Sequence, residues 1–306
     1  MKKILTIFAL GLLSLSLSAQ ESARWLRKSD ISADGSTIAF SYQGDIFTVP
    51  VSGGLAKQIT SNQAYDSDPL WTADGKSIVF SSFREDTKDI WIISAEGGKA
   101  RRLTTFPGAE TPLFVSKDGV VYFSANIQPD VNYDKFPGEP QVYTVNIKDG
   151  KSSLYTSIPM MNISANSNGI VLYEDYKGYE DPLRKHHTSS VTRDIWKYLP
   201  KKGQYQKLSR FAGENRNPVF TSNGLDYYFL SEQSGNFNVW KSNINAPETA
   251  TQITQLPTHP VRNLSIAADN TLLFSYNGDL YTLAPDAEKP AKVDIKVITD
   301  TNDKEH

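Results

Sequence analysis

One pattern recurs six times along this chain, and it constrains the fold more than any other feature of the sequence. Each copy runs from an apolar strand through a tight Asp/Asn–Gly turn into a second apolar strand. A polar residue, an aliphatic–aromatic pair and a closing Leu/Ile–Thr-like pair follow. The turns are Asp34-Gly35, Asp74-Gly75, Asp118-Gly119, Asn168-Gly169, Asn223-Gly224 and the degenerate Asp269-Asn270. A period of about 40–50 residues built from four short strands is typical of propeller blades.

The repeat therefore predicts an all-β fold, a six-bladed β-propeller of four-stranded antiparallel blades. The ring is expected over residues 20–298. Its blades are expected at approximately 31–60, 69–104, 112–156, 163–209, 218–254 and 264–295. Residues 299–306 form a polar tail that resembles a linker cut mid-way. How the ring closes is left open, because residues 23–28 and the outer strand of the sixth blade are both ambiguous.

Large aromatic side chains occupy equivalent places in the repeats. A four-stranded sheet cannot bury both of its faces alone, so each blade must pack against its neighbours. The tryptophans at these places are therefore expected to be core residues rather than ligand-stacking ones: Trp71, Trp91, Trp196 and Trp240.

Composition excludes several classes of function. The formal net charge is −2 and the pI is about 6.1, so the basic face that nucleic-acid binding requires is not expected. The chain has no cysteine, which excludes a thiol nucleophile and a disulfide framework. With only four histidines as well, most zinc sites are disfavoured.

The first 19 residues have the pattern of a secretory signal peptide. Lys2 and Lys3 give a positive start, residues 4–17 an apolar stretch, and Ala19 a small residue at a cleavage point. The apolar stretch is shorter than the ~20 residues that a membrane span needs. We expect a periplasmic or secreted protein with no membrane span after signal removal.

Familiar catalytic motifs are missing. The sequence has no Gly-x-Ser-x-Gly elbow, no phosphate-binding Gly-x-x-x-x-Gly-Lys-Ser/Thr loop and no Gly-x-Gly-x-x-Gly run. The Asp–Gly pairs lack the alternating carboxylates of a calcium loop. We therefore predict no catalytic residue, no cofactor-binding residue, no metal ligand and no cofactor.

The loops that lead from one blade into the next carry polar residues that would surround one mouth of the central channel. These candidate pore or peptide contacts are Tyr65, Asp66, Asp68, Glu110, Asn215, Arg216, His259 and Arg262. Their mixed charges could bind the terminus of a peptide. The favoured interpretation is that they only keep the mouth of the channel hydrated.

Two insertions, at residues 126–140 and 174–193, fall between the second and third strands of their blades and should protrude on one face. The second insertion is a candidate docking element with a dense charged run at Asp181, Arg184, Lys185, His186 and His187. A solvated loop that packs on a neighbouring blade or a partner domain is the favoured interpretation. Metal binding by one histidine, with Asp175 or Glu180, is a weaker interpretation, because adjacent histidines point in opposite directions in an extended chain. Catalysis by Ser189 with His187 is weaker still, because no orienting acid or oxyanion donor accompanies them.

The repeats also carry a family resemblance. The run Ser32–Phe40, followed by Gly44–Val49, Gly53-Gly54 and Gln58–Thr60, resembles the repeat of TolB-type propellers and of the tricorn protease. The run Tyr176–Trp196 is similar to the first propeller of secreted tricorn-like serine peptidases of Gram-negative bacteria. The resemblance covers about residues 23–298, although many propellers share the repeat motif itself.

The resemblance implies a larger architecture, in which a six-bladed propeller precedes a seven-bladed propeller, a PDZ domain and a peptidase core. The family's catalytic residues lie in that core, and none of them matches a position in this chain. The first hypothesis is therefore an exported, non-catalytic propeller that gates or docks substrate for such a peptidase. Its expected partners are a peptide or protein ligand, or further domains of a larger peptidase.

Two other hypotheses remain. One is a stand-alone periplasmic TolB-like propeller that binds a partner protein, although TolB proteins usually carry an extra α/β domain before the propeller. The other is a small propeller lactonase or glycosidase, which would need a metal or paired carboxylates converging on the channel.

Overall fold

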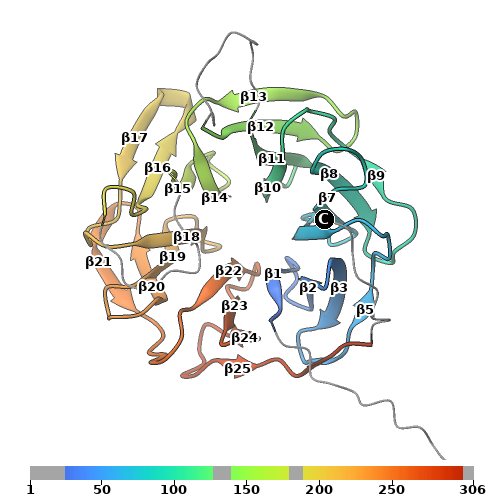
Figure 1. The fold of residues 1–306 in the computed structure, drawn as a ribbon. Coiled ribbons are helices and arrows are strands. Elements are labelled where there is room, and N and C mark those ends of the chain that lie inside the picture. Colours follow the sequence, from blue (N-terminus) through green and yellow to red (C-terminus); the bar gives the residue numbers. More distant parts are fainter. Residues whose placement is uncertain (1–24, 127–138, 179–188, 299–306) are drawn as a thin grey trace, which may run out of the picture.

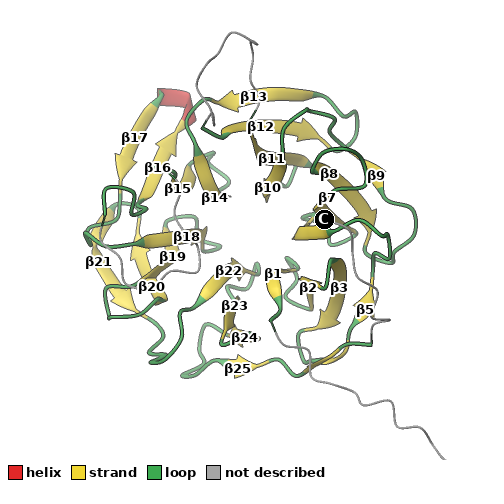
Figure 2. Ribbon diagram, viewed as in Figure 1, coloured by secondary structure: helices red, strands yellow, loops and turns green. Residues whose placement is uncertain are grey.

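The structure is a computed structural model that describes residues 25–126, 139–178 and 189–298. Its strands form six four-stranded antiparallel sheets, each made of strands that follow one another along the chain. The sheets stand around a common axis like the blades of a propeller, as Figure 1 shows. Figure 2 shows that almost all of the regular structure is strand. The predicted fold is confirmed.

The strands of each blade take equivalent places from the axis outward. The inner strands are β1 (Arg27–Ile31), β6 (Asp66–Trp71), β10 (Glu110–Val115), β14 (Met160–Ala165), β18 (Asn215–Phe220) and β22 (Arg262–Ile266). The second strands are β2 (Thr37–Tyr42), β7 (Ser77–Ser82), β11 (Val120–Ala125), β15 (Val171–Asp175), β19 (Asp226–Ser231) and β23 (Leu272–Tyr276).

The third strands are β3 (Asp45–Pro50), β8 (Asp89–Ser94), β12 (Gln141–Asn146), β16 (Ile195–Leu199), β20 (Asn238–Asn243) and β24 (Asp279–Leu283). The outer strands are β5 (Lys57–Gln58), β9 (Arg101–Arg102), β13 (Ser152–Thr156), β17 (Gln204–Lys207), β21 (Ala246–Gln252) and β25 (Ala291–Lys292). Outside the blades, β4 (Gly54–Leu55) pairs with β26 (Ile295–Lys296), and a short 3-10 turn spans Pro200–Lys202.

The predicted turns join the first and second strands of each blade. Gly35 and Gly75 have φ values of 73° and 67°, in the left-handed region where a side chain is disfavoured. The degenerate sixth turn keeps this conformation, because Asn270 has a φ of 71°. Asparagine tolerates the left-handed region better than most residues with a side chain, which explains the replacement.

The polar positions of the repeat link the end of the outer strand to the third strand in blades one, two, four and five. The Thr60 hydroxyl accepts a hydrogen bond from the Ile46 N–H at 2.9 Å and donates one to Asp45 Oδ1 at 3.1 Å. The fifth blade repeats this arrangement, with Thr254 between the Val239 N–H and Asn238 Oδ1, each at 2.9 Å. The acidic residue and the closing threonine of the sequence pattern therefore have a structural role, because they satisfy buried backbone groups.

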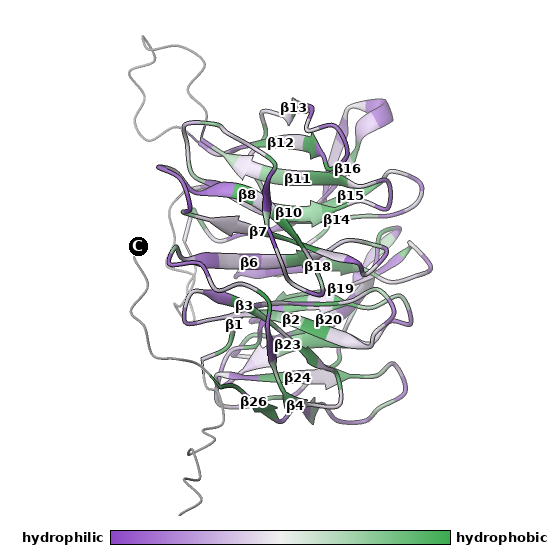
Figure 3. Ribbon diagram, turned by 90° about the vertical axis from the view of Figure 1, so that its right-hand side faces the viewer, coloured by the Kyte–Doolittle hydropathy of each residue, from purple (hydrophilic) through white to green (hydrophobic). Residues whose placement is uncertain are grey.

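Apolar side chains from facing blades form the core. The phenylalanines of the second strands are fully buried in four blades: Phe40, Phe80, Phe123 and Phe274. Trp71 and Trp91 lie in the cluster between blades one and two, and Trp196 and Trp240 are partly buried against the clusters of blades four and five. Figure 3 shows hydrophobic positions along the strands and hydrophilic residues in the loops at both faces. The core role predicted for the tryptophans is confirmed.

The first blade differs from the expectation at its inner edge. Its inner strand β1 begins at Arg27, whereas the sequence pattern placed the start of the blade at about Ile31. The pattern missed the strand because RKSDI is polar in all but its last residue. This strand pairs with β2 and packs beside the inner strand of blade six.

Candidate functional site

The inner strands all start at one face of the ring, because every blade runs through the same antiparallel course. Figure 1 shows these strands around the axis. Four predicted site residues are the first residues of inner strands: Asp66 in β6, Glu110 in β10, Asn215 in β18 and Arg262 in β22. We call this end of the channel the mouth. The sequence placed these residues in the loops that lead from one blade into the next, whereas in the structure they are already part of the inner strands.

Asp66 is fully buried and paired at the mouth. Its Oδ2 lies 2.7 Å from a guanidinium nitrogen of Arg84, which comes from the loop between β7 and β8. The same guanidinium lies 5.2 Å from the ring centroids of Phe80 and Trp91. Charge pairing and cation–π contact together hold the loop of blade two over the start of its inner strand.

Asp68 lies between Lys28 of β1 and Lys88, which directly precedes β8. Its oxygens are 3.5 Å from Lys28 Nζ and 3.0 Å from Lys88 Nζ. Burial alone would raise the pKa of Asp68, but the two ammonium groups outweigh burial and hold the pKa well below its usual range. The Lys28 side chain is 56% exposed, so this cluster presents a positive group to solvent at the mouth.

Glu110 has the opposite electrostatic environment. Its buried carboxyl group accepts hydrogen bonds from the Thr104 hydroxyl and from the Ile90 N–H, the latter at 3.1 Å. Burial raises the pKa of Glu110 to about 7, and the nearby carboxylate of Asp89 contributes to the rise. At neutral pH the Glu110 carboxyl group is therefore partly protonated.

Two mouth residues of blade five are held by local contacts. The amide of Asn215 is buried and donates to the carbonyl oxygens of Phe211 and Gly213, at 3.2 and 3.1 Å. Arg216 pairs with Glu214 at 2.6 Å and lies 5.3 Å from the ring centroid of Phe237. Both side chains therefore stabilise the start of β18.

The remaining predicted residues lie further apart around the ring. The His259 ring stands edge-on to Tyr276, with 5.9 Å between the centroids. The carbonyl of Arg262 accepts a hydrogen bond from Ser275 Oγ at 3.2 Å, and Tyr65 is half-buried just before β6. The eight predicted contacts share one end of the channel but do not form a single cluster. Outside the described residues lie the charged positions of the proposed docking insertion, Asp181, Arg184, Lys185, His186 and His187.

A ring of left-handed residues was missed in the sequence. Each inner strand has a register shift in its pairing with the second strand of the same blade. In five blades the shift contains a non-glycine residue with φ between 45° and 55°: Lys28, Asp68, Asn162, Asn217 and Asn263. The signal available was an Asp or Asn one residue before Pro69, Ile163, Pro218 and Leu264. These bulges re-aim side chains next to the axis.

The bulge residues connect neighbouring blades. Asn217 donates its amide to the Leu264 carbonyl at 2.9 Å and accepts from the Leu264 N–H at 3.0 Å. Asn162 donates to Glu174, a fully buried carboxylate that also pairs with Arg193 and accepts from the Asn217 N–H. Glu174 and Arg193 therefore tie the two ends of the blade-four insertion to the ring.

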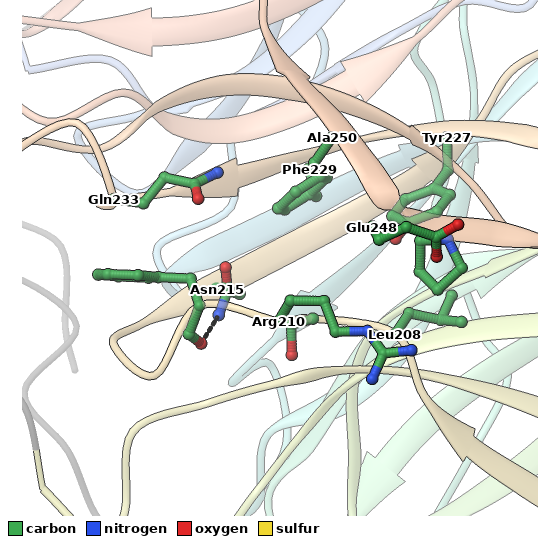
Figure 4. Close-up of a pocket in the computed structure, with 11 residues that line it drawn as sticks. Leu208, Arg210, Asn215, Tyr227, Phe229, Gln233, Glu248 and Ala250 are labelled. Atoms are coloured by element: carbon green, nitrogen blue, oxygen red, sulfur yellow. Dashed lines mark hydrogen bonds between the residues drawn. The ribbon is translucent and has the colours of Figure 1, made fainter.

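A narrow cleft lies between blades four and five, and Figure 4 shows its lining. Buried Tyr227 and Phe229 form its apolar wall, with Arg210 and Glu248 among the polar lining residues. Asn215 also lines this cleft.

Within the part of the chain that the structure describes, no group of three or more metal-ligating side chains gathers. Among the same residues, no helix has the length and apolar character to cross a bilayer.

The family model that matches this chain is the tricorn protease N-terminal β-propeller domain, and the match runs over residues 23–289. The chain belongs to this family. The match ends within the sixth blade, so it spans nearly the whole ring.

Individual relatives agree with this assignment. A tricorn protease homolog of Saccharolobus solfataricus is 22% identical over 278 residues, which cover 89% of this chain and 25% of that protein. The crystal structure of the tricorn protease matches with a TM-score of 0.76 at 21% identity, over 92% of this chain and 27% of the other. TolB from Acinetobacter baumannii matches with a TM-score of 0.63 at 17% identity, over 85% of this chain and 63% of the other. The chain thus spans about a quarter of the length of the curated relative, and the likeness to TolB concerns the fold alone.

Proposed function

We propose that this chain is an exported, non-catalytic propeller module that admits or docks peptide substrate for the peptidase domains of a tricorn-like serine peptidase. The observation that carries the proposal is the family match over residues 23–289 together with the ring of six blades that residues 27–292 form. The buried carboxylates of Asp66 and Glu174 are committed to ion pairs with Arg84 and Arg193. We assign these ion pairs a structural role, and we assign peptide-bond cleavage to other domains.

The mouth supplies the contacts for docking. Lys28 is the exposed member of the Asp68 cluster, and it offers a cation to a carboxylate of an incoming peptide. Asn263 of the inner strand β22 is half-buried, donates to Ser275 Oγ at 3.1 Å and adds a polar group beside the axis. Export is supported by the signal-like residues 1–19, which lead to a periplasmic or secreted location.

The catalytic part of the proposal is tested by incubating the purified mature chain with a quenched random peptide library. The expected result is no turnover, because the chemistry belongs to other domains. Turnover that persists after trace-protease controls would overturn the non-catalytic assignment.

The docking part is tested with labelled peptides and fluorescence anisotropy. Lys28→Ala should weaken peptide binding roughly fivefold, equivalent to about 1 kcal/mol, because it removes the exposed positive charge of the Asp68 cluster. Lys151→Ala is the matched control, because Lys151 is 85% exposed and lies in the turn between β12 and β13. Equal affinities of the two variants, or no binding by the parent chain, would reject docking at the mouth.

A further inference from the structure

The boundary between blade six and blade one differs from every other boundary in the ring. Each blade is built from one continuous stretch of the chain, and no strand is exchanged between the four-stranded sheets of the first and last blades. The continuous chain crosses the other five boundaries as it leaves one outer strand and enters the next inner strand. Blades six and one are instead joined by non-covalent contacts, and we call this boundary the seam.

At the axis, the seam has the same kind of hydrogen bond as the boundary between blades four and five. The Ile31 N–H donates to Ser265 Oγ at 3.2 Å across the seam. The equivalent bond between blades four and five runs from the Phe220 N–H to Ser164 Oγ at 3.0 Å. On the opposite face to the mouth, the Ala268 N–H donates to the Ala33 carbonyl at 2.8 Å. The inner half of the seam is therefore an ordinary blade interface.

At the rim, β26 takes the place of the missing covalent link. After β25 the chain runs along the edge of the ring to blade one, where β26 pairs in parallel with β4 (Figures 1 and 3). The Gly54 and Ala56 N–H groups donate to the Asp294 and Lys296 carbonyls, both at 2.8 Å. Ile295 is buried in a cluster that joins residues of blades one and six.

The close approach of β26 to blade one requires a glycine at position 53. A Cβ atom on Gly53 would lie 2.5 Å from the Asp294 carbonyl oxygen, a contact that backbone atoms cannot relieve without moving β26. Gly97 has the equivalent place in the next blade and nearly the same φ, 88° against 85°. The nearest atom to a Cβ on Gly97 is the Ile59 carbonyl oxygen at 3.6 Å, an ordinary contact. Close approach of a strand is therefore specific to the seam.

We propose that β26 is a latch, and that its release lets the ring open at the seam while the blades stay folded. A two-residue parallel pair is a small contact, so it is suited to a local opening that needs less free energy than global unfolding. The other boundaries keep their covalent link when their interfaces loosen. An open seam would give a polypeptide a lateral route to the inner strands, separate from the mouth.

Native-state hydrogen exchange with a matched pair of variants tests the latch. The seam amides are those of Ala56, Ile31 and Ala268, and the reference amides are those of β11 in blade three. In the parent chain, the seam amides should exchange together and about tenfold faster than the reference amides. Gly53→Ala should speed exchange at the seam about tenfold further. Gly97→Ala carries the same left-handed strain, but it should leave the seam unchanged relative to the reference. Seam amides that exchange only with the reference amides, or equal seam exchange in the two variants, would overturn the proposal.

An engineered disulfide provides an independent test, since the chain has no cysteine of its own. Leu55 and Lys296 are both exposed and face each other in the β4–β26 register. In the double variant Leu55→Cys/Lys296→Cys, oxidation should slow seam exchange to the level of the reference amides, and reduction should restore it. If oxidised and reduced forms exchange alike at the seam, opening does not proceed through β26.

Discussion

Glu110 and Asp30 are buried carboxyl groups whose pKa values lie above their usual range. Burial raises the pKa of Glu110 to about 7 and that of Asp30 to about 6. Both groups bind their protons more tightly in the folded state than in the unfolded state. Their contribution to stability is therefore full below the unfolded pKa, near pH 4, and is lost as pH rises through 6 to 7.

This environment predicts a specific pH dependence for Glu110→Gln. The parent chain should lose on the order of 1–2 kcal/mol of unfolding free energy from Glu110 between pH 5 and pH 8. The glutamine variant cannot ionise, so its stability should fall less over the same range. Urea unfolding at both pH values measures the difference. Identical pH slopes in the two proteins would contradict the buried position of this carboxyl group.

Asn217 combines a left-handed backbone with two hydrogen bonds to Leu264 across a blade boundary. Asn217→Gly should lose the hydrogen bonds but keep the backbone conformation, at a cost of about 1–2 kcal/mol. Asn217→Ala should lose roughly a further 1 kcal/mol, because alanine is disfavoured at positive φ. Chemical denaturation should rank the parent chain above the glycine variant and the glycine variant above the alanine variant. An alanine variant as stable as the glycine variant would rule out the backbone contribution.

At the scale of the element, four blades share a hydroxyl at the end of the outer strand that accepts from a backbone N–H of the third strand. In blade five, Thr254 is buried and accepts from the Val239 N–H. Thr254→Val leaves that backbone donor unsatisfied and should cost about 1–3 kcal/mol of stability. Thr254→Ser keeps the hydroxyl and should recover most of the loss.

The matched control for this element is Thr251→Val on β21, where the side chain is exposed and substitution should change stability by no more than about 0.5 kcal/mol. Thermal unfolding of the three variants is the measurement. A loss in Thr251→Val equal to that in Thr254→Val would show that the effect comes from the valine and not from the hydrogen bond.

At the scale of the whole molecule, the ring is one cooperative unit because each core cluster is shared by two blades. Leu273 and Leu280 of blade six pack in the same cluster as Phe40 of blade one. Deleting residues 257–298 would expose this cluster and the facing cluster of blade five at once. The truncated chain should therefore bind a hydrophobic dye and lose its cooperative thermal transition, as followed by near-ultraviolet circular dichroism. A cooperative transition within a few degrees of the parent would show that five blades fold independently of the sixth.

The sequence by itself determined the architecture of this protein. Asp/Asn–Gly turns, alternating apolar strands and closing threonines are local patterns, and their repetition predicted the number of blades and the strand order. Asp66, Glu110 and Asn215 were expected in the loops between blades, and the structure shows that the inner strands begin with them. Even the degenerate turn at Asn270 keeps the expected conformation, because asparagine satisfies the same backbone requirement as glycine.

Tertiary structure alone decided the electrostatics of the mouth and the closure of the ring. The raised pKa of Glu110 and the lowered pKa of Asp68 depend on which neighbours the fold brings close, and Lys28 lies far from Asp68 along the chain. The pairing of β26 with β4 joins residues from opposite ends of the propeller. A two-residue pair has no periodicity to detect, so its partner is specified only once the blades have stacked into a ring.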